Sequence, residues 1–143
     1  MKFEKVKEFA NITEEENKDI ERGKKLLRQN PSGKMGIQAS LSELSEVTDA
    51  LADIILGLKY QKIFLVDELE VLFLGYSTGK MGMFKEKELD FRFRNETSKE
   101  AERYKVLRIK KELLTIFSER VEKMTWDIKE KKADLKVAHS TDY

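Results

Sequence analysis

With 143 residues the chain is long enough for one domain, and its composition narrows what that domain can be. The absence of cysteine excludes disulfide-stabilised folds and thiolate metal sites, and a formal net charge of +1 lacks the strong positive excess of nucleic-acid-binding domains. With 38% charged residues and a single proline, the sequence predicts one all-α domain over residues 1–143, which we expect to be cytoplasmic.

Residues 1–30 predict two short helices. Apolar side chains recur at helical spacing over residues 3–10, which predicts the first helix. The second is expected to begin after Thr13, because Glu16 follows three residues later and the two can form a capping box. We expect this helix to end before Pro31, since the residue that precedes a proline is disfavoured in the α conformation.

The tetrapeptide Gly-Lys-Met-Gly occurs twice, at residues 33–36 and 79–82. Both copies follow an amphipathic segment, and glycine readily adopts the backbone conformations that reverse a chain after a helix. Neither copy has the spacing of a P-loop, which needs Gly, four residues and then Gly-Lys-Ser/Thr after a strand. We therefore interpret both copies as turns between helices, with anion binding and an internal duplication as the alternatives.

The clearest pattern in the chain predicts a long acidic helix over residues 37–74. Apolar residues recur there at alternating spacings of four and three, which is the heptad pattern of helices that pack along a seam. A straight helix of this length would extend roughly 60 Å, so we expect either a bend near Gly57 or an elongated molecule. Charged residues interrupt the apolar run over residues 54–74, so we do not expect it to cross a membrane.

Residues 75–97 predict a connector whose secondary structure the sequence leaves open. Glycine, serine and threonine at its start are typical of a turn. Residues 89–94 alternate apolar and charged side chains, which is a strand pattern, and a small β-hairpin could span residues 71–94. The heptad pattern, however, continues unbroken through residues 65–76, which favours helix in that part.

Residues 98–136 predict a second long helix. Thr97 and Glu100 have the spacing of another capping box, and apolar residues again recur at helical spacing. Segment 98–143 carries twelve basic and nine acidic residues, a net of +3, whereas segment 37–76 carries two basic and seven acidic residues, a net of −5. Opposite charges favour packing of the two helices, which predicts an elongated helical bundle or a long antiparallel hairpin.

The residues available for chemistry favour a non-enzymatic function. The only histidine, His139, falls in the expected tail over residues 137–143, so catalytic triads and histidine metal clusters are excluded. The long seams instead predict a protein–protein interaction module, such as an adaptor, a regulator or an assembly component, that binds a protein partner, forms homo-oligomers and needs no cofactor. The predicted interface residues are Leu44, Leu51, Ile55, Leu58, Leu65, Leu107, Leu114, Val121 and Met124.

One acidic cluster supports an alternative function. Glu46, Asp49 and Asp53 lie at positions i, i+3 and i+7, on one face of the predicted helix. Three carboxylates held this close repel one another unless a cation or a basic partner lies across from them, and Mg²⁺ is the usual cation. This stretch resembles the second acidic motif of the all-α nucleotide pyrophosphohydrolases, the group of MazG and phosphoribosyl-ATP pyrophosphatase.

The resemblance implies a Mg²⁺-dependent nucleoside triphosphate pyrophosphohydrolase. In that family an upstream acidic motif joins the second one in holding Mg²⁺. Its counterparts here would be Glu16 and Asp19, although Asp19 stands where the family has glutamate. A lysine-bearing segment after the next helix grips phosphate in the family, and Ser77 and Lys80 would take that role here.

A nucleic-acid-binding accessory protein is a second alternative. The sequence Phe-Arg-Phe-Arg at residues 91–94 interleaves arginines with aromatic rings, which can stack on bases. Acidic residues interrupt every basic run of the last helix, so nucleic acid is not the favoured partner. The basic residues concerned are Arg103, Lys110, Arg120, Lys131 and Lys132.

Overall fold

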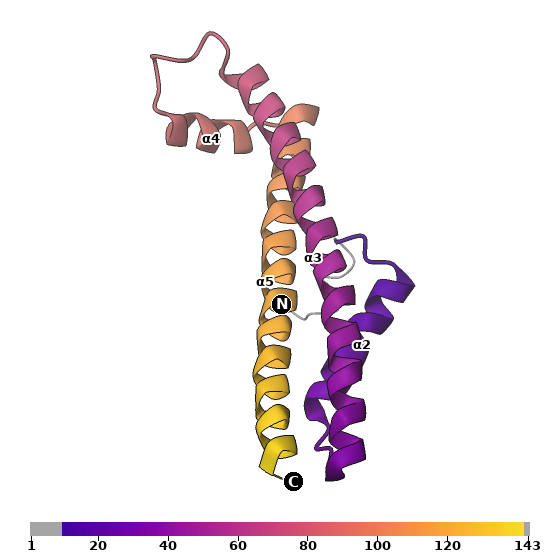
Figure 1. Cartoon of the computed structure of the whole chain (residues 1–143). Helices are drawn as coiled ribbons and strands as arrows, with labels where there is room; N and C mark the ends of the chain where they lie inside the picture. Colours follow the sequence, from indigo (N-terminus) through magenta and orange to yellow (C-terminus); the bar gives the residue numbers. More distant parts are fainter. Residues whose placement is uncertain (1–9, 142–143) are drawn as a thin grey trace.

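The computed structural model describes residues 10–141, which form four α-helices and no β-strand. These are α2 (Glu14–Arg28), α3 (Gly33–Ser77), α4 (Glu86–Arg94) and α5 (Lys99–Thr141). Figure 1 shows α3 and α5 lying side by side in opposite directions, with α2 beside one end of the pair and α4 across the other. The all-α, elongated architecture is thereby confirmed.

Helix α2 begins and ends where the sequence predicts. The Thr13 hydroxyl accepts a hydrogen bond from the Glu16 N–H, and the Glu16 carboxylate accepts one from the Thr13 N–H, each at 3.1 Å. This is the expected capping box, which satisfies two backbone donors at the start of the helix. The other short helix, expected over residues 3–10, lies outside the described residues except for Ala10.

Helix α3 is longer than predicted and does not break at Gly57. Its 45 residues extend over about 68 Å at 1.5 Å per residue, so the elongated alternative is correct. The helix begins at Gly33, which has a positive φ of 76°, so the first Gly-Lys-Met-Gly copy forms the first helical turn rather than a turn between helices. The second copy does form a turn, where Gly79 and Gly82 have φ values of 82° and 94°.

The connector contains a helix, and the possible β-hairpin over residues 71–94 is wrong. In α4, Leu89 and Phe93 are four residues apart, so they share one helix face, and both are buried. The ring of Phe93 stacks between those of Tyr76 and Tyr104, with centroid distances of 4.5 Å to each. Apolar residues that alternate over residues 89–94 also include a pair four residues apart, so the same pattern fits a strand or a helix. The aromatic stack around Phe93 favours the helix.

Helix α5 differs from its prediction at both ends. The Ser98 hydroxyl, not that of Thr97, caps it by accepting a hydrogen bond from the Ala101 N–H at 3.1 Å. The helix continues to Thr141, so the expected frayed tail is wrong for residues 137–141. Leu135 is buried and Ala138 packs against the core, which gives the last turns a buried face.

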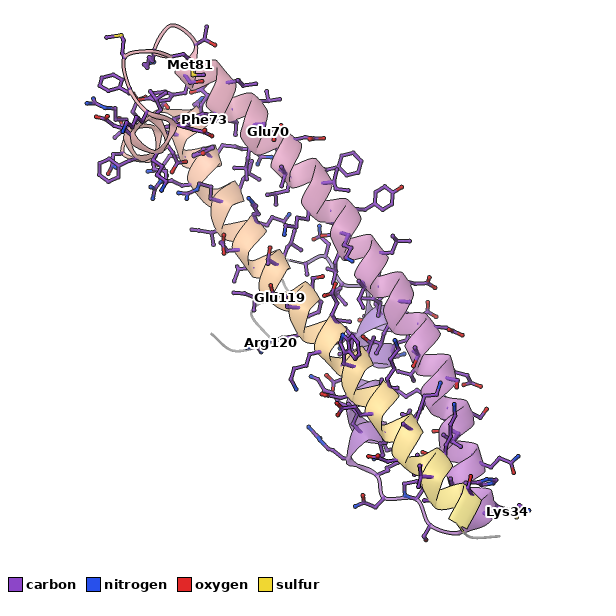
Figure 2. All side chains as sticks on the ribbon, turned by 60° about the vertical axis from the view of Figure 1, so that its left-hand side comes forward. Lys34, Glu70, Phe73, Met81, Glu119 and Arg120 are labelled. Atoms are coloured by element: carbon purple, nitrogen blue, oxygen red, sulfur yellow. The ribbon has the colours of Figure 1, made fainter. Side chains whose placement is uncertain are left out.

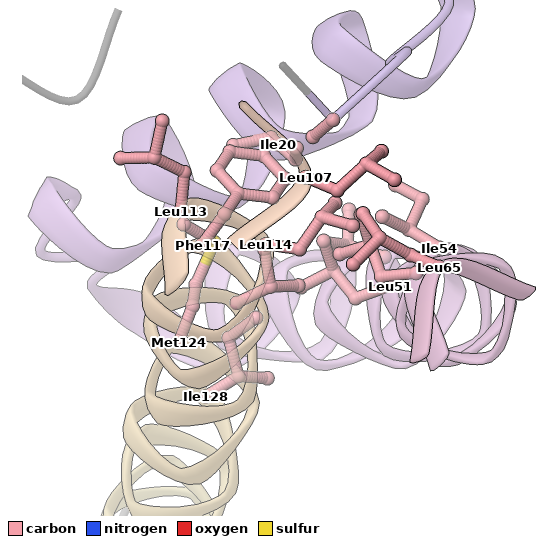
Figure 3. Packing of buried hydrophobic residues seen from close by; sticks show 14 of the residues in the cluster. Ile20, Leu51, Ile54, Leu65, Leu107, Leu113, Leu114, Phe117, Met124 and Ile128 are labelled. Atoms are coloured by element: carbon pink, nitrogen blue, oxygen red, sulfur yellow. The ribbon is translucent and has the colours of Figure 1, made fainter. Parts of the chain in front are cut away.

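The predicted seam forms the core between α3 and α5. Figure 3 shows α3 side chains such as Leu51 meeting α5 side chains such as Leu114. Helix α2 completes this core at one end, where Ile20 and Leu26 are buried. Within the described residues, no helix combines the length and hydrophobicity that crossing a membrane requires.

The molecule therefore has two halves that share one seam. We call α2 with residues 33–55 of α3 and 121–141 of α5 the three-helix half. Residues 56–77 of α3 and 99–120 of α5, together with α4, form the two-helix half. In this second half the described residues place no third long helix along α3 and α5 (Figure 1).

Candidate protein interface

An apolar stripe lies exposed on α3 in the two-helix half. Six large side chains form it, and each is between 57% and 69% exposed. We call this set the outer stripe, and its members are Leu56, Tyr60, Ile63, Phe64, Val71 and Leu74. It runs from residue 56 to residue 74 of one helix, which corresponds to a rise of about 27 Å.

The outer stripe faces away from the core because of its offset from the buried seam. Leu56 and Ile63 each precede a buried seam residue, Leu58 and Leu65, by two positions. Two residues correspond to about 200° of rotation around an α-helix, so the stripe and the seam lie on opposite faces. This part of α3 is therefore apolar on both faces, and residues 10–141 cover only the face toward α5.

Charges of both signs surround the outer stripe. Lys59 and Glu70 lie on one flank, and the Lys59 Nζ is 3.4 Å from a carboxylate oxygen of Glu122 on α5. On the other flank, the Arg103 guanidinium lies 2.6 Å from the Glu68 carboxylate. Asp67 is the charged residue in the middle of the stripe itself, and it is exposed. The stripe thus has a polar rim, as protein interfaces do, around a centre that is apolar except for Asp67.

A cavity of about 890 Å³ opens beside the stripe, between α3, α4 and α5. Figure 2 shows Glu70 and Phe73 near this end of the molecule, with Lys34 at the opposite end. Asp90 on α4 reaches into it, where it accepts hydrogen bonds from the Tyr104 hydroxyl and, at 3.0 Å, from Arg94. These polar groups bind one another and thereby fix α4 on α5.

Burial, followed by the hydrogen bond to Asp90, raises the pKa of the Tyr104 phenol to about 12. Burial likewise raises the pKa of Tyr76, with Glu96 as the second cause. Both phenols are therefore neutral at physiological pH. Their role in the structure is to pack α4 through the aromatic stack with Phe93, not to supply a base.

The acidic residues of the pyrophosphohydrolase resemblance lie in the three-helix half. Glu46, Asp49 and Asp53 are exposed on α3, and a carboxylate oxygen of Glu46 is 2.9 Å from the Arg22 guanidinium on α2. Glu16 and Asp19 lie on α2 and are partly exposed. Within residues 10–141, no three acidic or histidine side chains come close enough together to hold a metal ion.

The proposed phosphate-binding residues lie far from this acidic cluster. Ser77 is buried and donates its hydroxyl proton to the Leu74 carbonyl at 3.4 Å. The Lys80 ammonium donates to the Tyr76 carbonyl at 2.8 Å. Glu46 and Ser77 are separated by 31 residues of one continuous helix, or about 46 Å. A single chain therefore does not present both groups to one nucleotide.

The aromatic and basic residues considered for nucleic acid are largely engaged within the chain. Phe93 is buried, which leaves Phe91 as the exposed ring of the Phe-Arg-Phe-Arg sequence. Arg92 and Arg94 each pair with the acidic residue one turn earlier on α4. On α5, Lys131 donates hydrogen bonds to backbone carbonyls at the C-terminus of α2.

The predicted interface residues turn out to line the interior of the chain. Eight of them are buried between the helices and Ile55 is partly buried against the same core. They hold α3 to α5, so their side chains are not presented on the surface of the chain. The outer stripe was missed in the sequence, although residues 56, 60, 63, 67, 71 and 74 also recur at spacings of four and three. The buried heptad seam of α3 is enough to predict the helix, so this second apolar pattern was not needed to explain it.

Comparisons with protein-family models, with curated proteins and with solved structures find no match to this chain.

Proposed function

We propose that this chain is a helical protein–protein interaction module that forms homo-oligomers through the outer stripe. The observation that carries the proposal is the stripe itself: large apolar side chains that stay exposed along about 27 Å of a rigid helix. Contiguous apolar surface of this kind marks binding faces on soluble proteins. Such a surface supports a non-enzymatic role as an adaptor, a regulator or an assembly component.

The charges around the stripe favour a protein partner over a lipid surface. Helices that lie on membranes carry mostly lysine and arginine on their polar face, because the lipid surface is anionic. Here Asp67 lies within the stripe, and Glu70 flanks it beside Lys59. A mixed rim of this kind is suited to a partner with complementary charges of both signs.

The test compares two valines of similar exposure. Val71 belongs to the outer stripe and is 69% exposed, whereas Val137 lies on α5 in the three-helix half and is 65% exposed. Val71→Glu is expected to weaken self-association at least about tenfold, because it places a charge in an apolar interface. Val137→Glu is expected to leave it unchanged. Light scattering over a concentration series measures both, and equal masses for the two variants would contradict the proposal.

The hydrolase and nucleic-acid hypotheses have separate tests. If the acidic cluster binds Mg²⁺, calorimetric titration with Mg²⁺ and a non-hydrolysable nucleoside triphosphate gives saturable binding that Glu46→Gln abolishes. If the chain binds nucleic acid, its affinity falls steeply as the salt concentration rises. Both hypotheses stay predictions from the sequence.

A further inference from the structure

We propose that the outer stripe binds a second copy of this chain, with the two α3 helices antiparallel and related by a two-fold axis near Phe64 and Leu65. The inference rests on the proposed function and specifies its partner. A two-fold interface requires a surface that is complementary to itself, and the charges and side chains of the stripe meet that requirement.

The charged flank is complementary to itself only in the antiparallel arrangement. Lys59 and Glu70 are eleven residues apart, which is close to three turns, so both lie on the same flank of the stripe. In antiparallel helix pairs, the same flank of each helix faces its counterpart. A two-fold axis midway between the two residues therefore places Lys59 of each copy opposite Glu70 of the other. In a parallel pair the two-fold axis runs along the helices, so the matching flanks lie on opposite sides of the interface and Lys59 would not meet Glu70 of the other copy.

Asp67 also disfavours a parallel pair. It lies in the middle of the stripe and is exposed in the single chain. A parallel arrangement would bury the Asp67 carboxylates of the two copies against each other, which is unfavourable because both lose water and repel. The antiparallel arrangement separates them, since each then lies close to Ile63 of the other copy. A polar residue within a helical seam commonly specifies orientation in this way.

The apolar side chains also match under the same symmetry. The axis near residues 64 and 65 brings Leu56 of one copy to Leu74 of the other, and Tyr60 next to Val71. Phe64 lies close to the axis and meets its own copy. The two ends of the stripe thus cover each other from residue 56 to residue 74, and Ile63 is the apolar member whose nearest counterpart is Asp67.

Disulfide cross-linking distinguishes the two orientations, and the lack of native cysteine makes every introduced thiol unique. The variants are Leu56→Cys and Leu74→Cys, with Phe64→Cys as the central position. In the antiparallel pair, positions 56 of the two copies lie about 27 Å apart, far beyond the reach of a disulfide. All three substitutions are at exposed positions, and circular dichroism verifies that the helices are retained.

We expect a cross-linked dimer from Phe64→Cys alone and from a mixture of Leu56→Cys with Leu74→Cys, but not from Leu56→Cys or Leu74→Cys alone. Cross-linking of either end variant alone would show a parallel pair and overturn the inference. A dimer mass without cross-linking at any of the three positions would also overturn it. In both of these outcomes, a lower mass for Val71→Glu would still support self-association through the outer stripe. Only the antiparallel arrangement would then be wrong. A wild-type chain that stays monomeric at every concentration would overturn both.

Discussion

The two halves of the molecule use the same seam but differ in how completely it is covered. In the three-helix half, α2 lies along α3 and α5 and buries Ile20 and Leu26. Among the described residues, the two-helix half has α4 at its far end and Ala10, whose carbonyl accepts a hydrogen bond from Gln61, near its other end. Among residues 10–141, the exposed large apolar side chains of the three-helix half are Met35, Trp126 and Val137. Those of the two-helix half and its loop are Leu56, Tyr60, Ile63, Phe64, Val71, Leu74, Met81, Met83, Phe91, Val106, Ile109 and Ile116.

The difference shows that exposed apolar side chains are concentrated along one half of the helix pair. On α3 the outer face carries Asp49 and Asp53 in the three-helix half, but Tyr60 and Phe64 in the two-helix half. A face that remains in water throughout is polar, as in the first case. An apolar outer face, as at Tyr60 and Phe64, is expected where another chain covers the helix. Both halves therefore contribute to the core, and under the proposed function the two-helix half also offers the binding surface.

The largest expected effect comes from a charge in the shared seam. Leu51 and Leu114 are fully buried, so Leu51→Asp or Leu114→Glu would place an unpaired carboxylate in the core. The penalty is several kcal/mol, comparable to the ~5–15 kcal/mol that stabilises a typical domain. We expect loss of cooperative thermal unfolding in circular dichroism, and with it loss of self-association. A folded, dimeric variant would refute the role of the seam.

A smaller effect contrasts one cation from each half. Lys131 binds the carbonyls of Leu27, at 2.8 Å, and of Gln29, where its charge also complements the dipole of α2. Lys131→Met is expected to lower the free energy of unfolding by about 1–3 kcal/mol, because charged hydrogen bonds to α2 are lost. Arg103→Met removes an exposed ion pair with Glu68 and should cost less than about 1 kcal/mol. Urea denaturation compares them, and a larger loss for Arg103→Met would contradict the account.

Replacing a glycine with alanine is expected to affect the free energy of unfolding differently in the two halves. Nothing lies within 4 Å of a Cβ added at Gly57, so Gly57→Ala should raise the free energy of unfolding by about 1 kcal/mol through helix propensity. At Gly23 the added Cβ would lie 2.9 Å from the Met124 Sδ and 3.2 Å from a Val47 methyl. Gly23→Ala should therefore raise the free energy of unfolding by less than Gly57→Ala does, or lower it. Thermal melts at low protein concentration decide this, and equal stabilisation by both would show that α2 is loosely packed.

The smallest effect concerns alkaline pH. Folding raises the pKa of Tyr104 from its ordinary value of 10.0 to about 12, mainly by burial. Its contribution to stability is therefore complete below about pH 10 and is lost as the pH rises toward 12. Tyr104→Phe should show a shallower loss of stability over this range, with the remainder due to Tyr76. Identical slopes for the two proteins would indicate that Tyr104 ionises freely.

The sequence predicts the fold well where one pattern is long and unopposed. The seam over α3 and the capping box at Thr13 are confirmed, because heptad spacing and cap geometry are both local and specific. Helix α4 was missed because its apolar residues fit two periods, and the choice depends on rings contributed by Tyr76 and Tyr104. Only tertiary packing supplies that information.

The candidate site was harder to predict than the fold. Leucines of the seam and residues of the outer stripe have the same type and spacing, so the sequence does not say which face α5 covers. The acidic cluster at Glu46 and the residues at Ser77 looked compatible in sequence. The uninterrupted helix then placed them about 46 Å apart. The distance between these residues depends on whether the helix bends. The sequence did not decide this, because Gly57 allowed a bend.

The most direct test of the outer stripe is oxidative footprinting of side chains at low and high protein concentration. Tyr60 and Trp126 are 59% and 65% exposed, one in each half, and both react readily with hydroxyl radicals. If the outer stripe is the interface, labelling of Tyr60 and Phe64 falls as concentration rises, while labelling of Trp126 stays constant. Equal labelling of Tyr60 at all concentrations, in a protein whose mass shows self-association, would contradict the account.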